Sequence, residues 1–392
     1  MTRKESRLKV RDVDESGNRI RVMRVIARMN IGGPAVQISG LMRGINEREF
    51  DQRLYRGTCG ESEADYLEIV AKDVLSYPVN NLGRKVNFAG DLSALLNLIS
   101  EIRSFKPHIV HTHTAKAGVL GRIASILSLH PSIRIHTYHG HLLNGYFGPI
   151  KRQIMILIER MLSRFTHHLL AVGTKVRQDL LKEKIGKEQN FSVMPPGLEI
   201  GELLPTELAR KNLGLSEFSL QCGFIGRVTA IKRPDRFLDV VAEVKRRNID
   251  LEFFIAGDGD LFEYCRDRIA RESLPVSLLG WQTDIENVLS AADFLILTSD
   301  NEGTPLSLIQ AGMAGLPVVS TNVGSISEVV VCDETGLLVN TDVYQLVDAI
   351  EKLASSVELR QKLGENAKKF TMKNFGVKRL VSNHEELYKS IL

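Results

Sequence analysis

The chain has few of the residues that indicate a disulfide-stabilised or zinc-binding protein. It holds four cysteines in 392 residues, and they form no CxxC pair. Neither a disulfide framework nor a zinc site is therefore expected, and the pattern suits a reducing compartment. No apolar run reaches the roughly 18 residues of a membrane span, and the polar start of the chain lacks the apolar segment of a signal peptide. We expect a cytoplasmic protein whose residues 1–20 form a mobile leader.

Charge is unevenly distributed along the chain. Residues 1–200 contain 30 Lys and Arg against 19 Asp and Glu, a net +11, whereas the remainder carries −7. A basic half suits phosphate-bearing ligands or an anionic membrane surface, although scattered solvated charge explains it equally well. No recognisable nucleic-acid-binding motif accompanies the charge, so nucleic acid is not an expected partner.

Apolar, β-rich runs alternate with helical patterns throughout the sequence. Most runs are continuous rather than alternating, which is typical of strands buried on both faces of a parallel sheet. With helices between them, they predict βαβ architecture. The predicted strands are residues 19–29, 51–59, 74–79, 108–114, 133–139, 167–173, 220–227, 251–259, 275–281, 293–300, 316–324 and 336–339.

This alternation restarts after a stretch rich in proline and glycine, so we expect a linker around residues 194–215. Ligands of open parallel sheets bind at the carboxyl ends of the strands. Two such domains facing each other predict a cleft lined by the residues that follow the strands. The predicted units are the leader, an N-terminal domain (21–200), a C-terminal domain (201–375) and an amphipathic terminal helix (376–392).

Two loops that follow predicted strands carry glycines or cations. Gly32 and Gly33 precede a helix, where the backbone can approach a ligand and the helix N-terminus favours an anion. Arg227 and Lys232 share one loop in the C-terminal half; Arg binds phosphate oxygens in bidentate fashion and Lys adds a point charge. An ordinary turn and plain surface charge are the alternatives. The position of the two cations at a strand end favours a diphosphate clamp.

The stretch "SDNEGTPLSLIQAGMAG" places an acid where a helix begins. Glu302 can accept hydrogen bonds from sugar hydroxyls, and Gln310, eight residues later, can also bond hydroxyls. A helix entered through proline at its first turn directs its backbone amides toward an anion. The residues of this turn are Gly303, Thr304, Pro305 and Leu306. The alternative is that Glu302 merely complements the helix dipole and that Gln310 is solvated.

Histidines gather near the ends of two predicted strands. His139 closes one of them and can bond a substrate hydroxyl or exchange a proton near neutral pH. His136 and His141 are competing candidates. His111 and His113 lie on one face of the preceding strand. Without a convincing third ligand, they do not predict a metal site.

The stretch "AGDGD" is formally a D-x-D sequence, a spacing that can bridge a divalent cation to a diphosphate. Because Asp258 and Asp260 follow a buried strand and precede a helix, a turn with an N-cap aspartate explains them equally well. We favour the turn, and no metal is expected.

Together these stretches resemble the family 4 retaining glycosyltransferases, which have the GT-B fold of two Rossmann-like domains facing across a cleft, with a C-terminal helix that crosses back to the N-terminal domain. The resemblance spans about residues 22–392. It is carried by "GFIGRVTAIKRPD", "AGDGD", "LLGWQTDIENVLSAADFLILTSDNEGTPLSLIQAGMAGLPVVSTNVGSISEVV" and "TGLLV", with "GGP" and "HTYHGH" matching N-terminal motifs. "PHIVHTHTAKAGVLGRIAS" together with "HGHLLNGYF" looks like members that build bacterial capsule, O-antigen or exopolysaccharide repeats.

The resemblance implies a nucleotide-sugar donor in the cleft, usually a UDP-sugar, and no metal or other cofactor. Arg227 and Lys232 would bind the diphosphate and stabilise the departing nucleotide. Gly32 and Gly33 would face the phosphate and the reacting sugar. The acceptor would be a glycan or a polyprenyl-diphosphate-linked glycan, reached at the inner face of the membrane.

The same resemblance implies that His139 hydrogen-bonds a hydroxyl of the transferred sugar and that Glu302 holds further hydroxyls. The family's second glutamate, which contacts the ribose, is Gln310 in this chain. Since charged hydrogen bonds are stronger than neutral ones, the exchange is expected to weaken ribose binding by ~1 kcal/mol or more. Transfer with retention is expected to proceed by front-face attack, with the leaving diphosphate helping to deprotonate the acceptor.

Two alternatives stay open at this stage: a UDP-sugar epimerase of the same shape, and a catalytically weak binding subunit, which Gln310 suggests. The segment 149–165 reads as an apolar helix with cationic flanks. Such a helix rests on a membrane surface or packs on its own sheet; we favour packing and keep peripheral membrane contact as a hypothesis.

Overall fold

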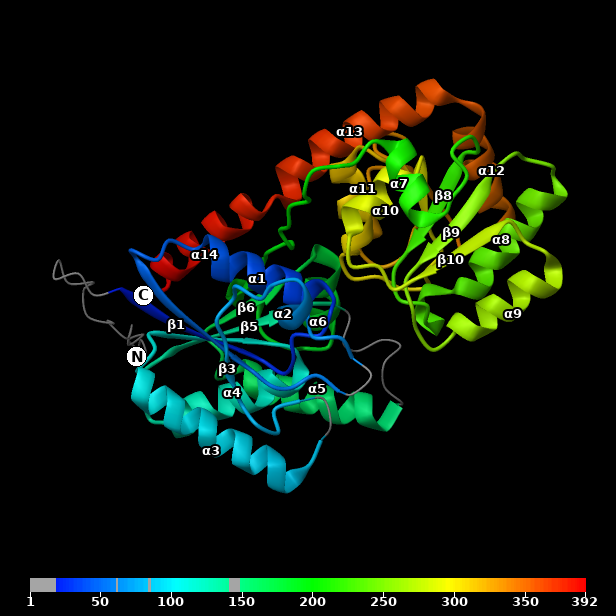
Figure 1. Cartoon of the computed structure of the whole chain (residues 1–392). Helices are drawn as coiled ribbons and strands as arrows, with labels where there is room; N and C mark the ends of the chain where they lie inside the picture. Colours follow the sequence, from blue (N-terminus) through cyan, green and yellow to red (C-terminus); the bar gives the residue numbers. More distant parts are fainter. Residues whose placement is uncertain (1–18, 61–62, 84–85, 141–148) are drawn as a thin grey trace.

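Two parallel β-sheets organise the chain, one in each half (Figure 1). The computed structural model describes residues 19–60, 63–83, 86–140 and 149–392. The N-terminal sheet has the strand order β3-β2-β1-β4-β5-β6-β7, and the C-terminal sheet has the order β10-β9-β8-β11-β12-β13. The predicted GT-B architecture of two Rossmann-like α/β halves is confirmed.

The N-terminal half alternates strands and helices as the apolar runs predict. Its short β7 was not predicted: these three residues lie immediately before the predicted linker at 194–215, with one residue between the strand and Pro195. The elements are β1 (Ile20–Ile26), α1 (Gly33–Gly44), β2 (Phe50–Arg56), α2 (Tyr66–Ile69), β3 (Tyr77–Pro78), α3 (Phe88–Phe105), β4 (Ile109–His113), α4 (Ala115–Leu127), β5 (Ile133–Tyr138), α5 (Pro149–Ser163), β6 (His168–Ala171), α6 (Thr174–Lys182), the 3-10 turn η1 (Glu188–Asn190) and β7 (Phe191–Val193).

The C-terminal half repeats the pattern and ends in three consecutive helices. Its elements are α7 (Thr206–Leu213), β8 (Gln221–Ile225), the 3-10 turn η2 (Ala230–Lys232), α8 (Pro234–Arg246), β9 (Glu252–Ala256), α9 (Phe262–Glu272), β10 (Val276–Gly280), α10 (Ile285–Ala291), β11 (Phe294–Leu297), α11 (Leu306–Ala314), β12 (Val318–Thr321), the 3-10 turn η3 (Ile326–Glu328), β13 (Leu337–Val339), α12 (Val343–Ser355), α13 (Val357–Phe375) and α14 (Val377–Ser390).

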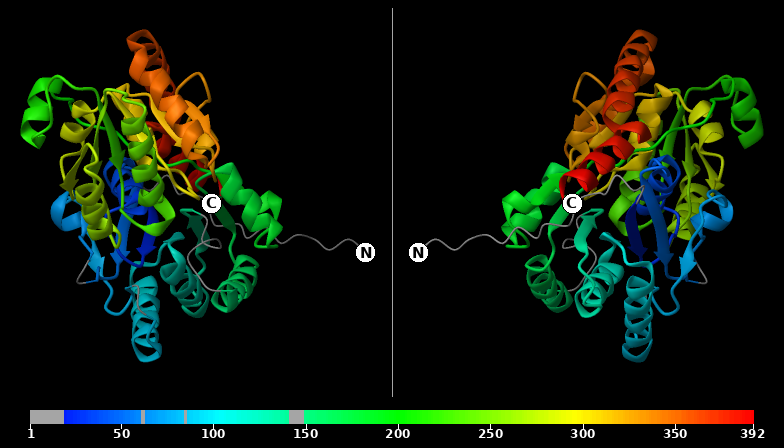
Figure 2. Two further views of the ribbon diagram at one scale, coloured as in Figure 1. Left: turned by 90° about the vertical axis from the view of Figure 1, so that its right-hand side faces the viewer. Right: turned by 90° about the vertical axis from the view of Figure 1, so that its left-hand side faces the viewer.

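Helices cover both faces of the N-terminal sheet. In Figure 1, α1 and α14 lie above it, and α3, α4 and α5 lie below it; Figure 2 shows the same layers from two sides. Central strands such as β4 and β8 are buried along their whole length, so both faces of each sheet supply core side chains. This burial explains why their sequences are continuous apolar runs.

The chain crosses between the two halves twice, and the two crossings are hydrogen-bonded to each other. The first crossing runs from β7 to α7 and contains the predicted boundary at residue 200; the second is the break between α13 and α14. The amide of Leu198 donates to the carbonyl of Phe375 at 2.9 Å, and the amide of Val377 donates back to Leu198 at 3.0 Å. Both connections between the domains therefore pass through one point.

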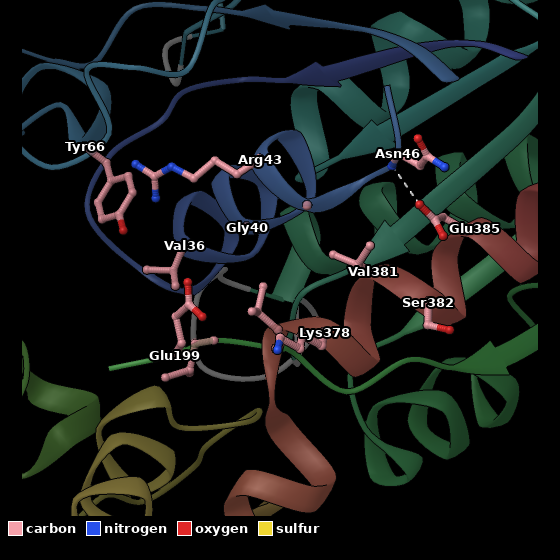
Figure 3. Close-up of a pocket in the computed structure, with 14 residues that line it drawn as sticks. Val36, Gly40, Arg43, Asn46, Tyr66, Glu199, Lys378, Val381, Ser382 and Glu385 are labelled. Atoms are coloured by element: carbon pink, nitrogen blue, oxygen red, sulfur yellow. Dashed lines mark hydrogen bonds between the residues drawn. The ribbon is translucent and has the colours of Figure 1, made fainter. Parts of the chain in front are cut away.

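The terminal helix α14 returns to the N-terminal domain, as predicted, and packs on α1. Gly40 and Gly44 give it room, because an added methyl group would lie 2.9 Å from Val377 at the first position and 2.5 Å from Val381 at the second. A cavity of about 550 Å³ opens between α1, α14 and the first crossing, and the amide of Asn46 donates to Glu385 at its rim (Figure 3). Its described lining contains none of the predicted donor-site residues.

Four local predictions need correction or fall outside the described residues. Asp258 does not cap the helix that follows: the N-cap of α9 is Leu261, and Asp258 instead accepts a 2.7 Å bond from the amide of Gly259 in the preceding turn. Pro305 is the N-cap of α11 rather than its first helical residue. The predicted leader lies outside the described residues up to residue 18, and Ile20 already belongs to β1; His141 is also outside them.

Candidate active site

The C-terminal side of the site is built from the loops after β8 and β11. These strands are neighbours in the sheet, so the loops at their carboxyl ends emerge side by side. The hydroxyl of Thr298 donates to the carbonyls of Lys232 and Arg233 at 3.1 and 3.0 Å, and Asp300 pairs with Arg233 and Arg236. These bonds fix the loop that carries Lys232 against the loop that carries Glu302.

Lys232 and Glu302 form an ion pair in the structure. Their nitrogen and oxygen atoms are 2.5 Å apart, and the two side chains are 15% and 10% exposed. The hydroxyl of Ser299 donates to the same carboxylate oxygen. The sequence predicted one residue for phosphate and the other for sugar hydroxyls; the structure shows that they already contact each other.

The side chains of Arg227 and Gln310, by contrast, have no hydrogen-bond or ion-pair partner among the described residues. Arg227 is exposed at the exit of β8, and Gln310 is partly exposed on the second turn of α11. The cation and the amide are therefore both free to contact a ligand.

The Glu302 loop reaches across to the N-terminal domain. A methyl group on Gly303 would lie 3.2 Å from the Cα of Gly140 and 3.6 Å from the carbonyl oxygen of His139. The hydroxyl of Thr304 donates to the carbonyl of Val172 at 3.1 Å. The predicted turn therefore lies beside the predicted histidine, although the two segments are in different domains.

Two helix N-termini meet at the same place. A methyl group on Gly33, the first residue of α1, would lie 3.8 Å from the side chain of Leu306, the first residue of α11. Gly32 is the N-cap of α1, and neither helix has a side-chain cap or an acidic residue in its first turn. The N-termini of both helices and the positive ends of their dipoles suit an anion.

His139 follows β5 and is partly exposed. Burial lowers the pKa of its imidazole to about 4, so the ring is neutral at neutral pH. Its Nε2 lies 2.9 Å from Nδ1 of His113. A neutral imidazole can hydrogen-bond a sugar hydroxyl without adding charge to the site. His136, a competing candidate, is fully buried and bonds Thr112, which leaves it away from the cleft.

Sequence reasoning missed several residues that shape the site. Glu328 of the C-terminal domain accepts hydrogen bonds from the amides of Thr174 and Lys175, at the N-terminus of α6 in the other domain, at 2.7 and 3.0 Å. Gly324 has φ +57° and lies against Glu302, where an added methyl group would come within bonding distance of the backbone. The chain between β12 and η3 therefore holds the Glu302 loop in place. In the sequence, only Gly324 could have indicated this contact.

No group of three or more potential metal ligands occurs among the residues that the structure describes. His111 and His113 are buried, and each has a ring nitrogen within hydrogen-bond distance of a neighbouring side chain. Within the described ranges no helix is long and apolar enough to cross a bilayer.

Two family models match the chain in succession. "Glycosyltransferase Family 4" matches residues 31–202, and "Glycosyl transferases group 1" matches residues 206–370. The chain is 29% identical over 348 residues to the UDP-Gal:alpha-D-GlcNAc-diphosphoundecaprenol alpha-1,3-galactosyltransferase of Escherichia coli, covering 84% of this chain and 87% of that protein. It is 24% identical to the capsular polysaccharide biosynthesis glycosyltransferase CapM of Staphylococcus aureus, covering 79% and 83%.

Solved structures share the architecture. Anabaena HepE in complex with UDP-glucose matches with a TM-score of 0.80 and 19% identity, over 94% of this chain and 99% of that one. The lipopolysaccharide outer core galactosyltransferase WaaB, in its apo form, matches with a TM-score of 0.71 and 17% identity, over 95% and 100%. With the two family models matched in order, one on each domain, the chain belongs to the family 4 glycosyltransferases of the GT-B fold.

Proposed function

We propose that this glycosyltransferase moves a sugar from a UDP-sugar to a hydroxyl of a lipid-diphosphate-linked glycan, with retention of configuration and without a metal ion. The observation that carries the proposal is the convergence of Lys232, Glu302 and the start of α11 with His139 across the two domains. Cations and helix N-termini suit a diphosphate, while a carboxylate and a neutral imidazole suit sugar hydroxyls.

Each group has a distinct part in the proposed reaction. Lys232 and Arg227 stabilise the negative charge that develops on the diphosphate as the bond to the sugar carbon breaks. The amides at the starts of α1 and α11 contribute to the same stabilisation. The acceptor hydroxyl attacks from the face that the diphosphate leaves, and a diphosphate oxygen takes its proton. Two cations replace the charge that a metal ion would otherwise supply.

The donor and acceptor to test first are those in the name of the Escherichia coli relative, UDP-galactose and GlcNAc-diphosphoundecaprenol. We expect mass spectrometry to show one hexose added to this acceptor, and NMR of the product to show an α linkage. Activity should persist in excess EDTA. A β-linked product would refute retention, and loss of activity in EDTA that Mg²⁺ restores would refute metal independence.

Two controls separate transfer from the remaining alternatives. UDP-sugar interconversion without an acceptor would indicate an epimerase. Nucleotide binding with neither transfer nor donor hydrolysis, across a panel of UDP-sugars, would indicate a binding subunit. Arg227→Ala and Lys232→Ala should each remove most turnover; near-wild-type rates in either variant would contradict the proposed clamp.

A lipid-linked acceptor requires the enzyme to work at a membrane surface, and α5 carries an exposed apolar stripe that suits this. The stripe continues into the turn after the helix, and its side chains are 51–77% exposed: Ile150, Ile154, Leu157, Met161 and, in the turn, Phe165. Lys151 and Arg164 are exposed beside them. The opposite face packs inward, since Glu159 is buried in an ion pair with Arg122. One face of α5 therefore packs on the domain, and the other, exposed face is available for the proposed membrane contact.

We propose that this stripe contacts the anionic inner leaflet. The enzyme should co-sediment with vesicles that contain phosphatidylglycerol and less well with pure phosphatidylcholine vesicles. The double variant Ile154→Ser/Leu157→Ser should weaken binding about tenfold or more, at ~25 cal/mol per Å² of apolar area lost from contact. Phe218→Ser is the matched control, because Phe218 is 98% exposed on the other domain. Equal loss in both variants, or no vesicle binding, would refute the contact.

A further inference from the structure

A row of four histidine rings runs through the N-terminal domain from α14 to the cleft. His384 lies next to His111, whose ring centroid is 6.0 Å away; His111 stacks on His113 at 4.3 Å; and His113 lies 5.2 Å from His139. The first three side chains are fully buried. His139, at the end of the row, is the member that reaches the site.

Hydrogen bonds fix the inner part of this row. Nδ1 of His111 lies 2.6 Å from the hydroxyl of Tyr388 on α14, and its Nε2 lies 2.7 Å from the hydroxyl of Thr137 on β5. Arg24 approaches the same Nδ1 at 3.4 Å and is itself held by Gln52. The ring of His111 therefore cannot turn, and it supports the ring of His113 from behind.

Burial lowers the pKa of each of these imidazoles, and nearby Arg24 lowers those of His111, His113 and His384 further. All four rings are therefore neutral at neutral pH, and each has one N–H and one lone pair. The 2.9 Å contact between Nδ1 of His113 and Nε2 of His139 holds a single hydrogen, which belongs to one ring or the other.

The surroundings of His113 decide which ring carries that hydrogen. Its other nitrogen, Nε2, is buried and has no partner among the described residues. A buried N–H without an acceptor is rarer in proteins than an acceptor without a donor. Nε2 of His113 is therefore the bare nitrogen, and Nδ1–H of His113 donates to Nε2 of His139. His139 then carries its own hydrogen on Nδ1, which has no partner among the described residues.

We propose that His113 is a positioning residue: its Nδ1–H holds the ring of His139 in the orientation and tautomer that directs Nδ1–H toward a hydroxyl oxygen of the transferred sugar. This inference rests on the proposed function, since it assumes that a sugar lies beside His139. The ring of His111, held by Tyr388 and Thr137, keeps His113 in place. Through Tyr388, the terminal helix α14 thus helps to fix the ring of His139 at the other end of the histidine row.

The tautomer can be measured directly in the full-length protein with ¹⁵N-labelled histidine. Long-range ¹H–¹⁵N spectra should show His139 with its hydrogen on Nδ1, assigned by its loss in His139→Ala. In His113→Leu, the ring should lose this fixed tautomer. In His113→Asn, whose amide nitrogen takes the place of Nδ1, the tautomer should be kept. A wild-type His139 with its hydrogen on Nε2 would overturn the proposal, whether or not the leucine variant folds.

Kinetics provide the second readout. His113→Leu should lower kcat about tenfold or more and leave UDP affinity within about twofold, because UDP binds the other domain; His113→Asn should recover most of the rate. His136→Leu is the matched control: His136 is equally buried on the adjacent strand, so a merely structural loss would appear there too, with the His139 tautomer unchanged. Equal kcat losses in His113→Leu and His113→Asn would refute the positioning role. Failure of the proposed function is distinguishable, since it would abolish transfer in the wild type and leave the tautomer intact.

Discussion

Mutation of a binding-site residue usually weakens ligand binding. The ion pair between Lys232 and Glu302 leads us to predict the opposite for one variant of Glu302. Without a ligand, the cation that we propose binds the diphosphate is held by a carboxylate 2.5 Å away. A diphosphate must compete with that carboxylate for Lys232 and must also tolerate its negative charge. Glu302→Gln keeps the shape of the side chain and removes the charge, so we expect it to bind UDP more tightly than the wild type.

The size of the effect follows from the exposure of the pair. Exposed ion pairs contribute about 0–1 kcal/mol, whereas breaking a fully buried pair costs about 3–5 kcal/mol. Lys232 and Glu302 are 15% and 10% exposed, which places them between these limits. A gain of about 1–2 kcal/mol corresponds to about 5- to 30-fold in the dissociation constant of UDP. The same change should lower kcat about tenfold or more, because charged hydrogen bonds to the sugar are lost.

Isothermal titration calorimetry with UDP measures the first effect, and initial-rate kinetics measure the second. Asp300→Asn is the matched control: it removes the same charge two residues away, but Asp300 pairs with Arg233 and Arg236 rather than with Lys232. Its UDP affinity should change by less than about twofold. In a Lys232→Met background, Glu302→Gln should bring no gain. Unchanged or weaker UDP binding in Glu302→Gln, in a variant that melts at the wild-type temperature, would refute the competition.

Three further predictions concern stability, ribose binding and domain contact. The pKa of a histidine in the unfolded chain is near 6.5, whereas the pKa of His139 in the folded protein is about 4, so stability should fall as the pH drops through this window, by about 2 kcal/mol at pH 5 from His139 alone. Urea titrations at pH 7.5, 6 and 5 measure this, and a flat profile would contradict it. Gln310→Glu should strengthen UDP binding by about 1 kcal/mol and leave pyrophosphate binding unchanged in calorimetry. An equal change for both ligands would show that residue 310 does not act through the ribose. Glu328→Ala removes a carboxylate that accepts hydrogen bonds from two amides of the other domain. The domains should then separate more easily, so small-angle scattering without donor should show a larger radius of gyration. An unchanged radius would show that these bonds do not hold the domains together.

Much of the site could be predicted from sequence because parallel strands bring their carboxyl ends to one edge. Local patterns were enough to find the exits of β5, β8 and β11, and with them His139, Lys232 and Glu302. The ion pair was not predictable in the same way. Its partners are 70 residues apart, and their contact depends on β8 and β11 being neighbours in the sheet. Strand order is a property of the whole domain, which local periodicity does not contain.

Longer-range contacts were missed for the same physical reason. Glu328 meets the start of α6 from 154 residues away, and Tyr388 meets His111 from 277 residues away. Each looks locally like an ordinary polar residue on a turn or a helix. His111 and His113 were placed correctly on one face of a strand. That α14 packs against this face could be seen only in the structure. The strand β7 was missed because it has only three residues and lies beside a stretch rich in proline and glycine, and it forms because β6 offers it an edge to pair with.

The positions of the interdomain contacts suggest how the site opens. Both chain crossings meet at Leu198, where their backbones are hydrogen-bonded, so a rotation of the domains about this point would keep the two connections together. Among the described residues, the hydrogen bonds on the cleft side join Glu328 to the start of α6 and Thr304 to Val172, and they lie beside close packing of Gly303 on Gly140 and of Gly33 on Leu306. Polar contacts of this kind exchange readily with water, which makes them suited to repeated opening for donor entry and UDP release. Because α14 stays packed on the N-terminal domain while α13 belongs to the other, the break at Gly376 can bend without disturbing the support that Tyr388 gives to the histidine row.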